Sequence, residues 1–263
     1  HLFKSLIFFY SFLIFSLGAC LGSFANVCIY RLPKNKQIIS GRSFCPKCKK
    51  KIIWCDNLPL ISFLFLSGKC RKCNKVISPR YFIVELIMGF IFLLIYLTSD
   101  SLSSIIFLSI LSLIFVVIFF IDLENFIIPD VLNFSVMALG LLKNFIPNFN
   151  TSLIHEINQS IIGGIVGYVS IWLIIFLYKT FKKIDGMGLG DAKLMAGIGL
   201  LFGWQSIPFV LFVSSILGLI FVVPSLIKKQ KTMRTEIPFG PFIIVACLIY
   251  FTYGDFLYSL ILV

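Results

Sequence analysis

Long apolar runs separated by short polar stretches dominate the chain. About 20 consecutive apolar residues are enough for a helix to cross the ~30 Å hydrocarbon core of a bilayer. The first run, residues 5–30, continues too far to be a cleavable signal peptide, so we predict a retained first helix. The pattern predicts an all-α polytopic membrane protein, and the remaining runs are residues 81–98, 103–121, 127–146, 157–178, 194–227 and 237–263.

The run 194–227 is long enough for more than one helix, because its 34 residues contain no charged side chain. Lysine clusters precede and follow it, and Lys- and Arg-rich segments tend to stay on the cytoplasmic side of a membrane. If both clusters are cytoplasmic, an even number of helices lies between them. We therefore expect two short helices that turn near Trp204–Pro208, which gives about eight transmembrane helices with both termini outside.

The composition agrees with this fold class. Hydrophobic residues make up 59% of the chain and charged residues 13%, whereas soluble domains carry about 25% charged residues. A disordered chain, a coiled coil and a small disulfide scaffold are excluded as descriptions of the whole chain.

The charge is concentrated in one segment, residues 31–80. This segment holds thirteen of the 23 Lys and Arg residues but a single acid, Asp56, so its excess equals the net charge of +12 of the whole chain. Such an excess can attract nucleic acid or anionic lipid, but beside membrane helices it more often marks a cytoplasmic loop. We therefore expect a first helix (1–30), a basic cytoplasmic loop (31–80) and a transmembrane core of about seven helices (81–263), with membrane lipid rather than nucleic acid as partner.

Two C-x-x-C pairs in the basic loop, separated by 21 residues, predict a metal site formed by Cys45, Cys48, Cys70 and Cys73. Two such pairs supply the four thiolates of a tetrahedral zinc site. Two disulfides or a redox dithiol are the alternatives, although cytoplasmic thiols are kept reduced. We expect structural zinc, which would contribute the folding energy of a loop with a very small core.

The residue inventory limits the chemistry to carboxylates. Only two histidines occur, His1 and His155, so a Ser-His or Cys-His nucleophile pair is not expected, and no H-E-x-x-H motif exists. Acidic residues within membrane segments are costly and therefore indicate function. The candidates are Glu85, Asp122, Glu124, Asp130, Asp185, Asp191 and Asp255.

Two of these acids are expected to reach the same membrane level. Asp122 ends the third predicted helix and Asp191 begins the sixth, both at the cytoplasmic side. Paired carboxylates that share one proton can act as an aspartyl protease. The nearby glycines, including Gly188 and Gly190, would let an extended substrate backbone lie beside Asp191. Two alternatives stay open for Asp122 and Asp191. They are ordinary helix-end residues, with Asp191 capping the next helix, or they belong to an ion or proton path in a transporter.

Five motifs in order make the chain similar to the bacterial type IV prepilin peptidases (leader peptidase and N-methyltransferase). Residues 22–27 (GSFANV) with 31–33 (RLP) resemble the first-helix motif, and the two cysteine pairs resemble the zinc loop. Residues 121–122 with 129–130, and 188–193 (GLGDAK), resemble the two aspartate motifs; residues 237–241 (IPFGP) resemble the start of the last helix. The chain departs from the family pattern at Cys55, where Tyr is common, and at Phe82, where Pro is common.

The resemblance implies a two-step enzyme in the bacterial cytoplasmic (inner) membrane. It would cleave the basic leader from prepilins or pseudopilins of type IV pilus, type II secretion or competence systems, near the cytoplasmic face. It would then methylate the new N-terminal residue with S-adenosylmethionine. Asp122 and Asp191 would be catalytic, Gly188 and Gly190 would position substrate, and the four cysteines would bind zinc.

Several points stay open from sequence. The sequence contains no glycine-rich nucleotide-binding motif that follows a strand, so no motif marks the methyl-donor site. Our hypothesis places this site in the cytoplasmic loop. Whether the chain forms a homo-oligomer, and what Glu85, Asp130 and Asp185 do, is not determined. The alternative functions are another G-x-G-D intramembrane protease, a proton-coupled transporter that uses the same aspartates, and a membrane scaffold with a partner-binding zinc loop.

Overall fold

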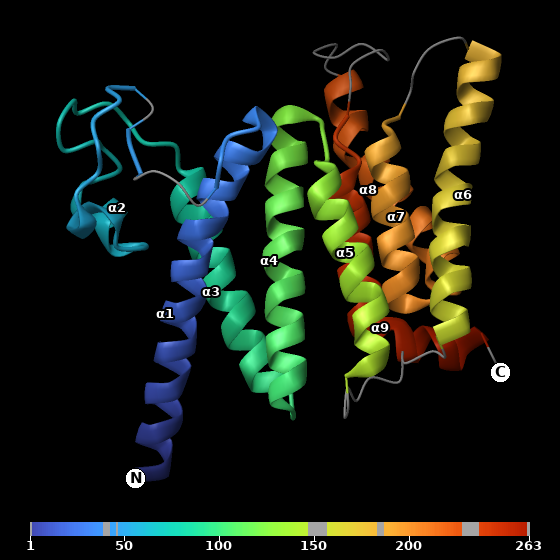
Figure 1. Ribbon diagram of the computed structural model, residues 1–263, viewed down its shortest axis with the longest axis horizontal. Coiled ribbons are helices and arrows are strands. Elements are labelled where there is room, and N and C mark those ends of the chain that lie inside the picture. Colours follow the sequence, from blue (N-terminus) through green and yellow to red (C-terminus); the bar gives the residue numbers. More distant parts are fainter. Residues whose placement is uncertain are drawn as a thin grey trace. The chain divides into compact units, whose positions relative to one another are not determined.

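The computed structural model describes residues 2–38, 43–45, 47–146, 157–182, 187–227 and 237–261 (Figure 1). Within these residues every regular element is a helix, and β-type pairing is limited to two isolated bridges, Phe44 with Lys51 and Lys69 with Val76. The predicted all-α fold is confirmed.

The helices follow the predicted apolar runs closely. The run 194–227 is divided at Gly203, whose φ of +75° ends one helix before the next begins at Ser206, so the predicted pair of helices is confirmed. The α-helices are α1 (Leu2–Arg31), α2 (Ile61–Phe65), α3 (Arg80–Thr98), α4 (Leu102–Asn125), α5 (Asp130–Leu142), α6 (Ile157–Lys182), α7 (Leu189–Phe202), α8 (Ser206–Ile227) and α9 (Gly240–Ile261). Three 3₁₀ turns cover Leu32–Lys34, Trp54–Asn57 and Lys143–Phe145.

In the part of the chain that the structure describes, five helices are long and apolar enough to cross a membrane: α1, α3, α4, α6 and α8. The chain is therefore a multi-pass membrane protein. The helices α5 and α7 are shorter, at 13 and 14 residues, and the apolar helix within α9 covers Gly240–Gly254. The count of eight transmembrane helices stays a prediction.

The chain forms two compact units, residues 1–117 (the N-terminal unit) and residues 118–263 (the C-terminal unit), and α4 contributes to both. In the N-terminal unit α1 packs along α3, as the blue and teal helices of Figure 1 show. Glycine makes this close approach possible. A Cβ atom added at Gly18 would lie 2.6 Å from the carbonyl oxygen of Met88, and one added at Gly22 would lie 2.7 Å from the Cα of Glu85.

The C-terminal unit is built around α7, which packs against α5 and α6. Most of its side chains are buried, including those of Leu194, Met195 and Ile198. Small residues allow close helix packing here, because a Cβ atom at Gly199 would overlap the carbonyl group of Gly163. The backbones of α6 and α7 are thus in direct contact, which fixes the position of α7.

Candidate active site and metal centre

Asp122 and Asp191 are both buried within the C-terminal unit. Asp122 lies in the last turn of α4 and Asp191 in the first turn of α7, and their side chains are 4% and 8% exposed. The two carboxyl groups are close enough for their charges to interact. The predicted meeting of these two acids at the ends of different helices therefore agrees with the structure.

The backbone of α9 holds one oxygen of Asp122. The N–H group of Gly240, the first residue of α9, donates a hydrogen bond to Oδ2 of Asp122 at 2.9 Å. A helix N-terminus presents unpaired N–H groups and a partial positive charge, both of which favour a carboxylate. A Cβ atom at position 240 would lie 2.9 Å from the same oxygen, so the close approach requires glycine.

Asp191 is positioned by the start of α7. Gly188 occupies the N-cap position in an extended conformation (φ −82°, ψ 147°) and has no side chain with which to cap the helix. The N–H of Asp191 donates to the carbonyl oxygen of Gly188 at 3.2 Å. Gly188 rather than Asp191 is the N-cap residue, and the carboxylate of Asp191, three positions further on, accepts a hydrogen bond from the backbone of Gly188. The alternative that Asp191 helps to cap this helix therefore stays open.

The two predicted substrate-positioning glycines have different surroundings. A Cβ atom at Gly188 would have no neighbour closer than 3.8 Å, and the nearest side-chain atom would be Oδ2 of Asp191 at 3.9 Å. A Cβ atom at Gly190 would lie 3.2 Å from Ile128. Gly188 is thus exposed, and a side chain there would make only ordinary contacts beside the Asp191 carboxyl group, while Gly190 allows close packing against the segment that follows α4.

Asn133 of α5 is a further polar residue of this site, and none of the sequence motifs includes it. Its side chain is completely buried, and its Nδ2 donates to the carbonyl oxygen of Gly190 at 3.2 Å. This bond ties α5 to the first turn of α7, next to Asp191. The sequence feature that could have indicated Asn133 is its position as a polar residue inside the apolar run 127–146.

The other candidate acids have separate roles or lie outside the described residues. Asp130 forms an ion pair with Lys193 at 2.6 Å, and it is 59% exposed. Glu85 belongs to the N-terminal unit. Asp185 lies outside the described residues, as does the side chain of Asp255.

Two buried carboxyl groups whose charges interact can perform acid–base chemistry on a bound peptide. Like charges held close together in a low-dielectric environment favour one shared proton. The ionised group can then take a proton from water while the protonated group donates to a carbonyl oxygen. Gly188 is exposed beside the Asp191 carboxyl group and so offers an extended backbone a point of access to the pair.

The four cysteines of the basic loop converge, and their sulfur atoms all lie within 4.8 Å of one another. All four are free thiols, so the disulfide alternative is wrong. The sulfur atoms of Cys45 and Cys73 are 4.0 Å apart. Four thiolates at Zn–S distances of about 2.3 Å would have S···S separations of roughly 3.8 Å in a tetrahedron. The donor set and its spacing therefore suit a metal ion.

Two similar turns present these sulfurs. In the first, the N–H of Lys49 donates to the Cys45 carbonyl at 2.8 Å; in the second, the N–H of Asn74 donates to the Cys70 carbonyl at 2.9 Å. Lys49 and Asn74 both have positive φ, 58° and 52°. The chain thus uses the same turn twice to point two thiols inward.

The turns also adjust the chemistry of the thiols. Hydrogen bonds from the backbone N–H groups of Lys72 and Cys73 lower the pKa of the Cys70 thiol to about 7. The Lys75 N–H acts in the same direction on Cys73, but burial and the neighbouring thiols outweigh it and raise the pKa of the Cys73 thiol to about 11. Thiolates rather than thiols bind metal ions, so Cys70 is the more readily ionised ligand of this pair.

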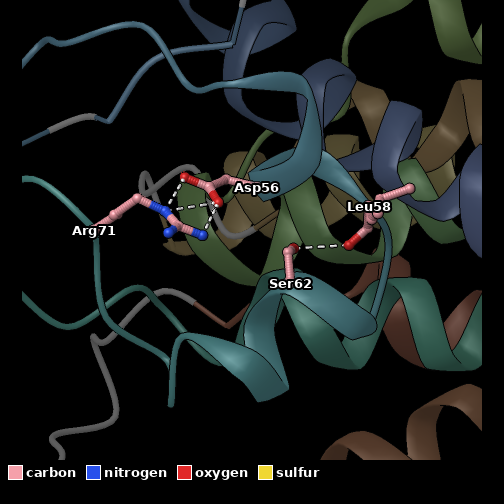
Figure 2. A network of polar contacts seen from close by, with 4 residues as sticks. All are labelled: Asp56, Leu58, Ser62 and Arg71. Carbon is pink, nitrogen blue, oxygen red and sulfur yellow. Dashed lines mark hydrogen bonds and ion pairs between the residues drawn. The ribbon is translucent and has the colours of Figure 1, made fainter.

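Polar contacts connect the rest of the loop. Arg71 forms a forked ion pair with Asp56, with a shortest distance of 2.7 Å, and the Ser62 hydroxyl donates to the Leu58 carbonyl (Figure 2). The carboxylate of Glu85 accepts the N–H of Leu60 at 2.8 Å, which links the loop to α3. Spacing alone could not predict this contact, because it joins residues on different elements.

Comparison with known proteins gives two family matches. A model described as the bacterial peptidase A24 N-terminal domain matches residues 16–99, and a model described as the type IV leader peptidase family matches residues 106–223. The first range contains the four cysteines and the second contains Asp122 and Asp191.

Curated relatives match over most of their length. A Vibrio cholerae protein is 38% identical over 91% of this chain and 95% of its own length. A protein of Aeromonas salmonicida is 31% identical over 94% of this chain and 91% of its own length. A protein of Pseudomonas aeruginosa is also 31% identical, over 91% of this chain and 89% of its own length. All three are named prepilin leader peptidase/N-methyltransferase. No solved structure matches the chain.

Proposed function

This chain belongs to the type IV leader peptidase family, and we propose that it removes the basic leader of prepilins or pseudopilins and then methylates the new N-terminal residue. The observation that carries the proposal is the buried pair of Asp122 and Asp191, at the ends of two helices whose positions are fixed by contacts with α9 and α5. We infer that these are the catalytic carboxylates.

We assign different roles to the two carboxyl groups. One oxygen of Asp122 is held by the Gly240 N–H, which leaves the other oxygen to take a proton from water. The resulting hydroxide attacks the carbonyl carbon of the scissile peptide bond, while Asp191 donates its proton to the carbonyl oxygen. The tetrahedral intermediate then collapses: the C–N bond breaks, the amine leaves with the proton that Asp122 took from water, and one hydroxyl of the intermediate returns its proton to Asp191 as the C=O bond re-forms.

The substrate has to be extended where it is cut. A helix uses its own N–H and carbonyl groups for hydrogen bonds and hides its peptide bonds, so a helical substrate would have to unwind at the scissile bond. The exposed position of Gly188, beside Oδ2 of Asp191, suits such an unwound segment. Gly190 would support this geometry indirectly, through its contact with Ile128.

The location and cofactors complete the proposal. We infer that the enzyme resides in the bacterial cytoplasmic membrane, with the aspartates near the cytoplasmic face, because the basic loop marks that side. We propose zinc as the metal of Cys45, Cys48, Cys70 and Cys73, since a closed set of four thiolates is typical of structural zinc. Zinc would stabilise the loop, and S-adenosylmethionine would supply the methyl group.

Cleavage of a synthetic prepilin in detergent tests the proposal. The parent protein, Asp122→Ala and Asp191→Ala are compared, with bound zinc as the check on folding, and exposed Asp100→Ala is the matched control. We expect the parent and the control to cut, and each active-site variant to lose at least ~10³-fold in rate while retaining zinc, by analogy with the loss of essential groups in other proteases.

Two results would contradict the proposal. If both aspartate variants still cut, the aspartyl mechanism is wrong. If the parent cuts none of several prepilins, the family activity does not apply, and substrate-dependent flux without a product of lower mass would identify a transporter.

A further inference from the structure

The N-terminal unit contains a cavity of about 740 Å³ between α1, α3 and the basic loop. Protein pockets for small ligands typically have volumes of ~300–1,000 Å³. Asp56, Ser62 and Arg71, drawn in Figure 2, belong to its loop wall, and Cys45 and Cys70 also line it. Neither the two aspartates nor any other residue of the C-terminal unit contributes to this lining. The cavity is thus formed by the N-terminal unit alone.

Two buried oxygen acceptors of the membrane helices line the cavity, Asn26 of α1 and Glu85 of α3. Asn26 is 2% exposed; its Nδ2 donates to the Tyr81 carbonyl at 3.0 Å, but its Oδ1 has no hydrogen-bond partner. Buried polar atoms are nearly always paired, so an unpaired acceptor at a cavity wall points to a group that is supplied from outside.

Glu85 is the acidic residue that α3 contributes to the cavity wall. It is 8% exposed; its Oε2 accepts the Leu60 N–H, and the Ser23 hydroxyl also donates to the carboxylate. Among the residues that the structure describes, no Lys or Arg forms an ion pair with this carboxylate. A buried carboxylate without a positive partner is unfavourable, so the cavity is suited to a ligand that carries a positive charge.

The remaining lining suits the other parts of a charged nucleoside. The aromatic rings of Phe44 and Phe63 offer apolar surface for a purine, and Lys50, Lys72 and Lys75 add positive charge that suits a carboxylate. A ligand with a purine, a carboxylate and a central cation matches all three features. S-adenosylmethionine, with its sulfonium centre, has this composition.

We propose that this cavity binds the sulfonium methyl donor, with the Glu85 carboxylate and the Asn26 Oδ1 facing the positive sulfur. The proposal rests on the methyl transfer inferred above and assigns it a site. In the reaction the N-terminal amine, after losing its proton to water, attacks the methyl carbon with its lone pair. A C–N bond forms and the C–S bond breaks. The bonding pair stays on sulfur, which becomes the neutral thioether of S-adenosylhomocysteine, and the methylated ammonium loses its remaining excess proton to water.

The charge of the sulfur provides the sharpest test. The full-length protein with its metal is studied in detergent by equilibrium dialysis with labelled S-adenosylmethionine and S-adenosylhomocysteine. We expect Glu85→Gln to weaken binding of the sulfonium donor about tenfold or more, because an opposite charge is removed. Binding of the neutral product should change less than ~3-fold, since the Gln amide oxygen can still accept the Leu60 N–H.

Two further variants distinguish the effect of losing the Glu85 charge from a general disruption of the cavity. Asp100→Asn removes one acid from the same unit outside the cavity and should bind both ligands like the parent. Asn26→Leu, which removes the unpaired acceptor, should also weaken donor binding. Equal changes for donor and product in Glu85→Gln, or no change in either variant, would overturn the proposal.

A variant that lacks zinc has not folded and cannot test the proposal. A second measurement therefore uses the parent protein alone. Ultraviolet crosslinking of labelled donor should mark peptides within residues 20–85, and crosslinks confined to residues 118–261 would overturn the assignment. If the parent cleaves and methylates but the cavity variants bind the donor normally, only this assignment fails. If the parent neither binds the donor nor methylates, the proposed methyl transfer itself is wrong.

Discussion

The two units of the protein place polar groups by different means. In the N-terminal unit, two repeated turns bring four cysteines together, and hydrogen bonds link the loop to the helices around a cavity. In the C-terminal unit, glycines allow helix backbones to touch, and this contact fixes α7, whose first turn holds Asp191. Glycines also bring α1 and α3 together in the N-terminal unit, but the four thiols lie in the loop, outside that contact. The comparison teaches that the cysteine cluster should depend on a metal ion, whereas the position of Asp191 should depend on glycines that carry no side chain.

The largest effect is expected in the contact between α6 and α7. Gly199→Ala places a methyl group on the carbonyl group of Gly163, and neither backbone can move without displacing its helix. We expect a loss of about 3 kcal/mol or more in stability, at the upper end of overpacking effects. Thermal unfolding in detergent and the yield of folded protein measure this.

A matched glycine of the same unit is the control. A Cβ atom at Gly218 in α8 would have no neighbour closer than 3.6 Å, so Gly218→Ala should be neutral or slightly stabilising through helix propensity. Equal destabilisation of the two variants would show that backbone contact is not what holds the C-terminal unit together.

Removal of the metal should affect the N-terminal unit alone. We expect a strong chelator to unfold the loop, because metal binding supplies ~10–16 kcal/mol in small structural zinc sites. Trypsin should then cut at the Lys and Arg residues of the loop, while peptides from residues 157–182 and 187–227 stay protected. The measurement is limited proteolysis followed by mass spectrometry, with Cys45→Ser as the genetic equivalent. A loop that resists trypsin without metal would argue against this dependence.

A moderate effect is expected at the link between α5 and α7. Asn133→Leu removes the hydrogen bond to the Gly190 carbonyl but fills the buried space with a side chain of similar size. A hydrogen bond of this kind contributes about 1 kcal/mol, so we expect a roughly 5–10-fold lower cleavage rate from a misplaced Asp191. The steady-state kcat should fall more than KM rises. A loss of stability with unchanged kcat would instead assign Asn133 a purely structural role.

The smallest effects are expected at the ion pairs of the two units. Each pair has one well-exposed partner: Arg71 is 58% and Asp56 11% exposed, and Asp130 is 59% and Lys193 28% exposed. Because water reaches one partner of each pair, we expect each pair to contribute about 1 kcal/mol or less. Arg71→Gln and Lys193→Gln should each lower the unfolding temperature by a few degrees at most, and the difference should shrink in high salt. A large, salt-independent loss for either variant would contradict this.

Hydropathy and spacing predicted much of this architecture. The apolar runs predicted the helices, including the division near Gly203, because a membrane helix must satisfy its backbone internally. The cysteine pairs predicted the cluster, since the C-x-x-C spacing is local. Asp122 and Asp191 were selected because buried acids are rare in apolar segments.

Contacts between distant elements could not be predicted in the same way. The Gly240 N–H donor to Asp122 is a backbone group, so no side-chain pattern marks it. The pairing of Glu85 with Leu60, and the unpaired acceptor of Asn26, arise from how α1, α3 and the loop pack. Their polar character is visible in the sequence, but their partners depend on three-dimensional packing.

The shortness of α7 has a consequence for the surrounding bilayer. Its 14 residues extend about 21 Å at ~1.5 Å per residue, against a hydrocarbon thickness of ~30 Å. A mismatch of this kind is accommodated by local thinning of the lipid. We therefore expect turnover to depend on acyl-chain length: short-chain lipids would bring the first turn of α7 closer to water, and long-chain lipids would bury it more deeply and slow the enzyme.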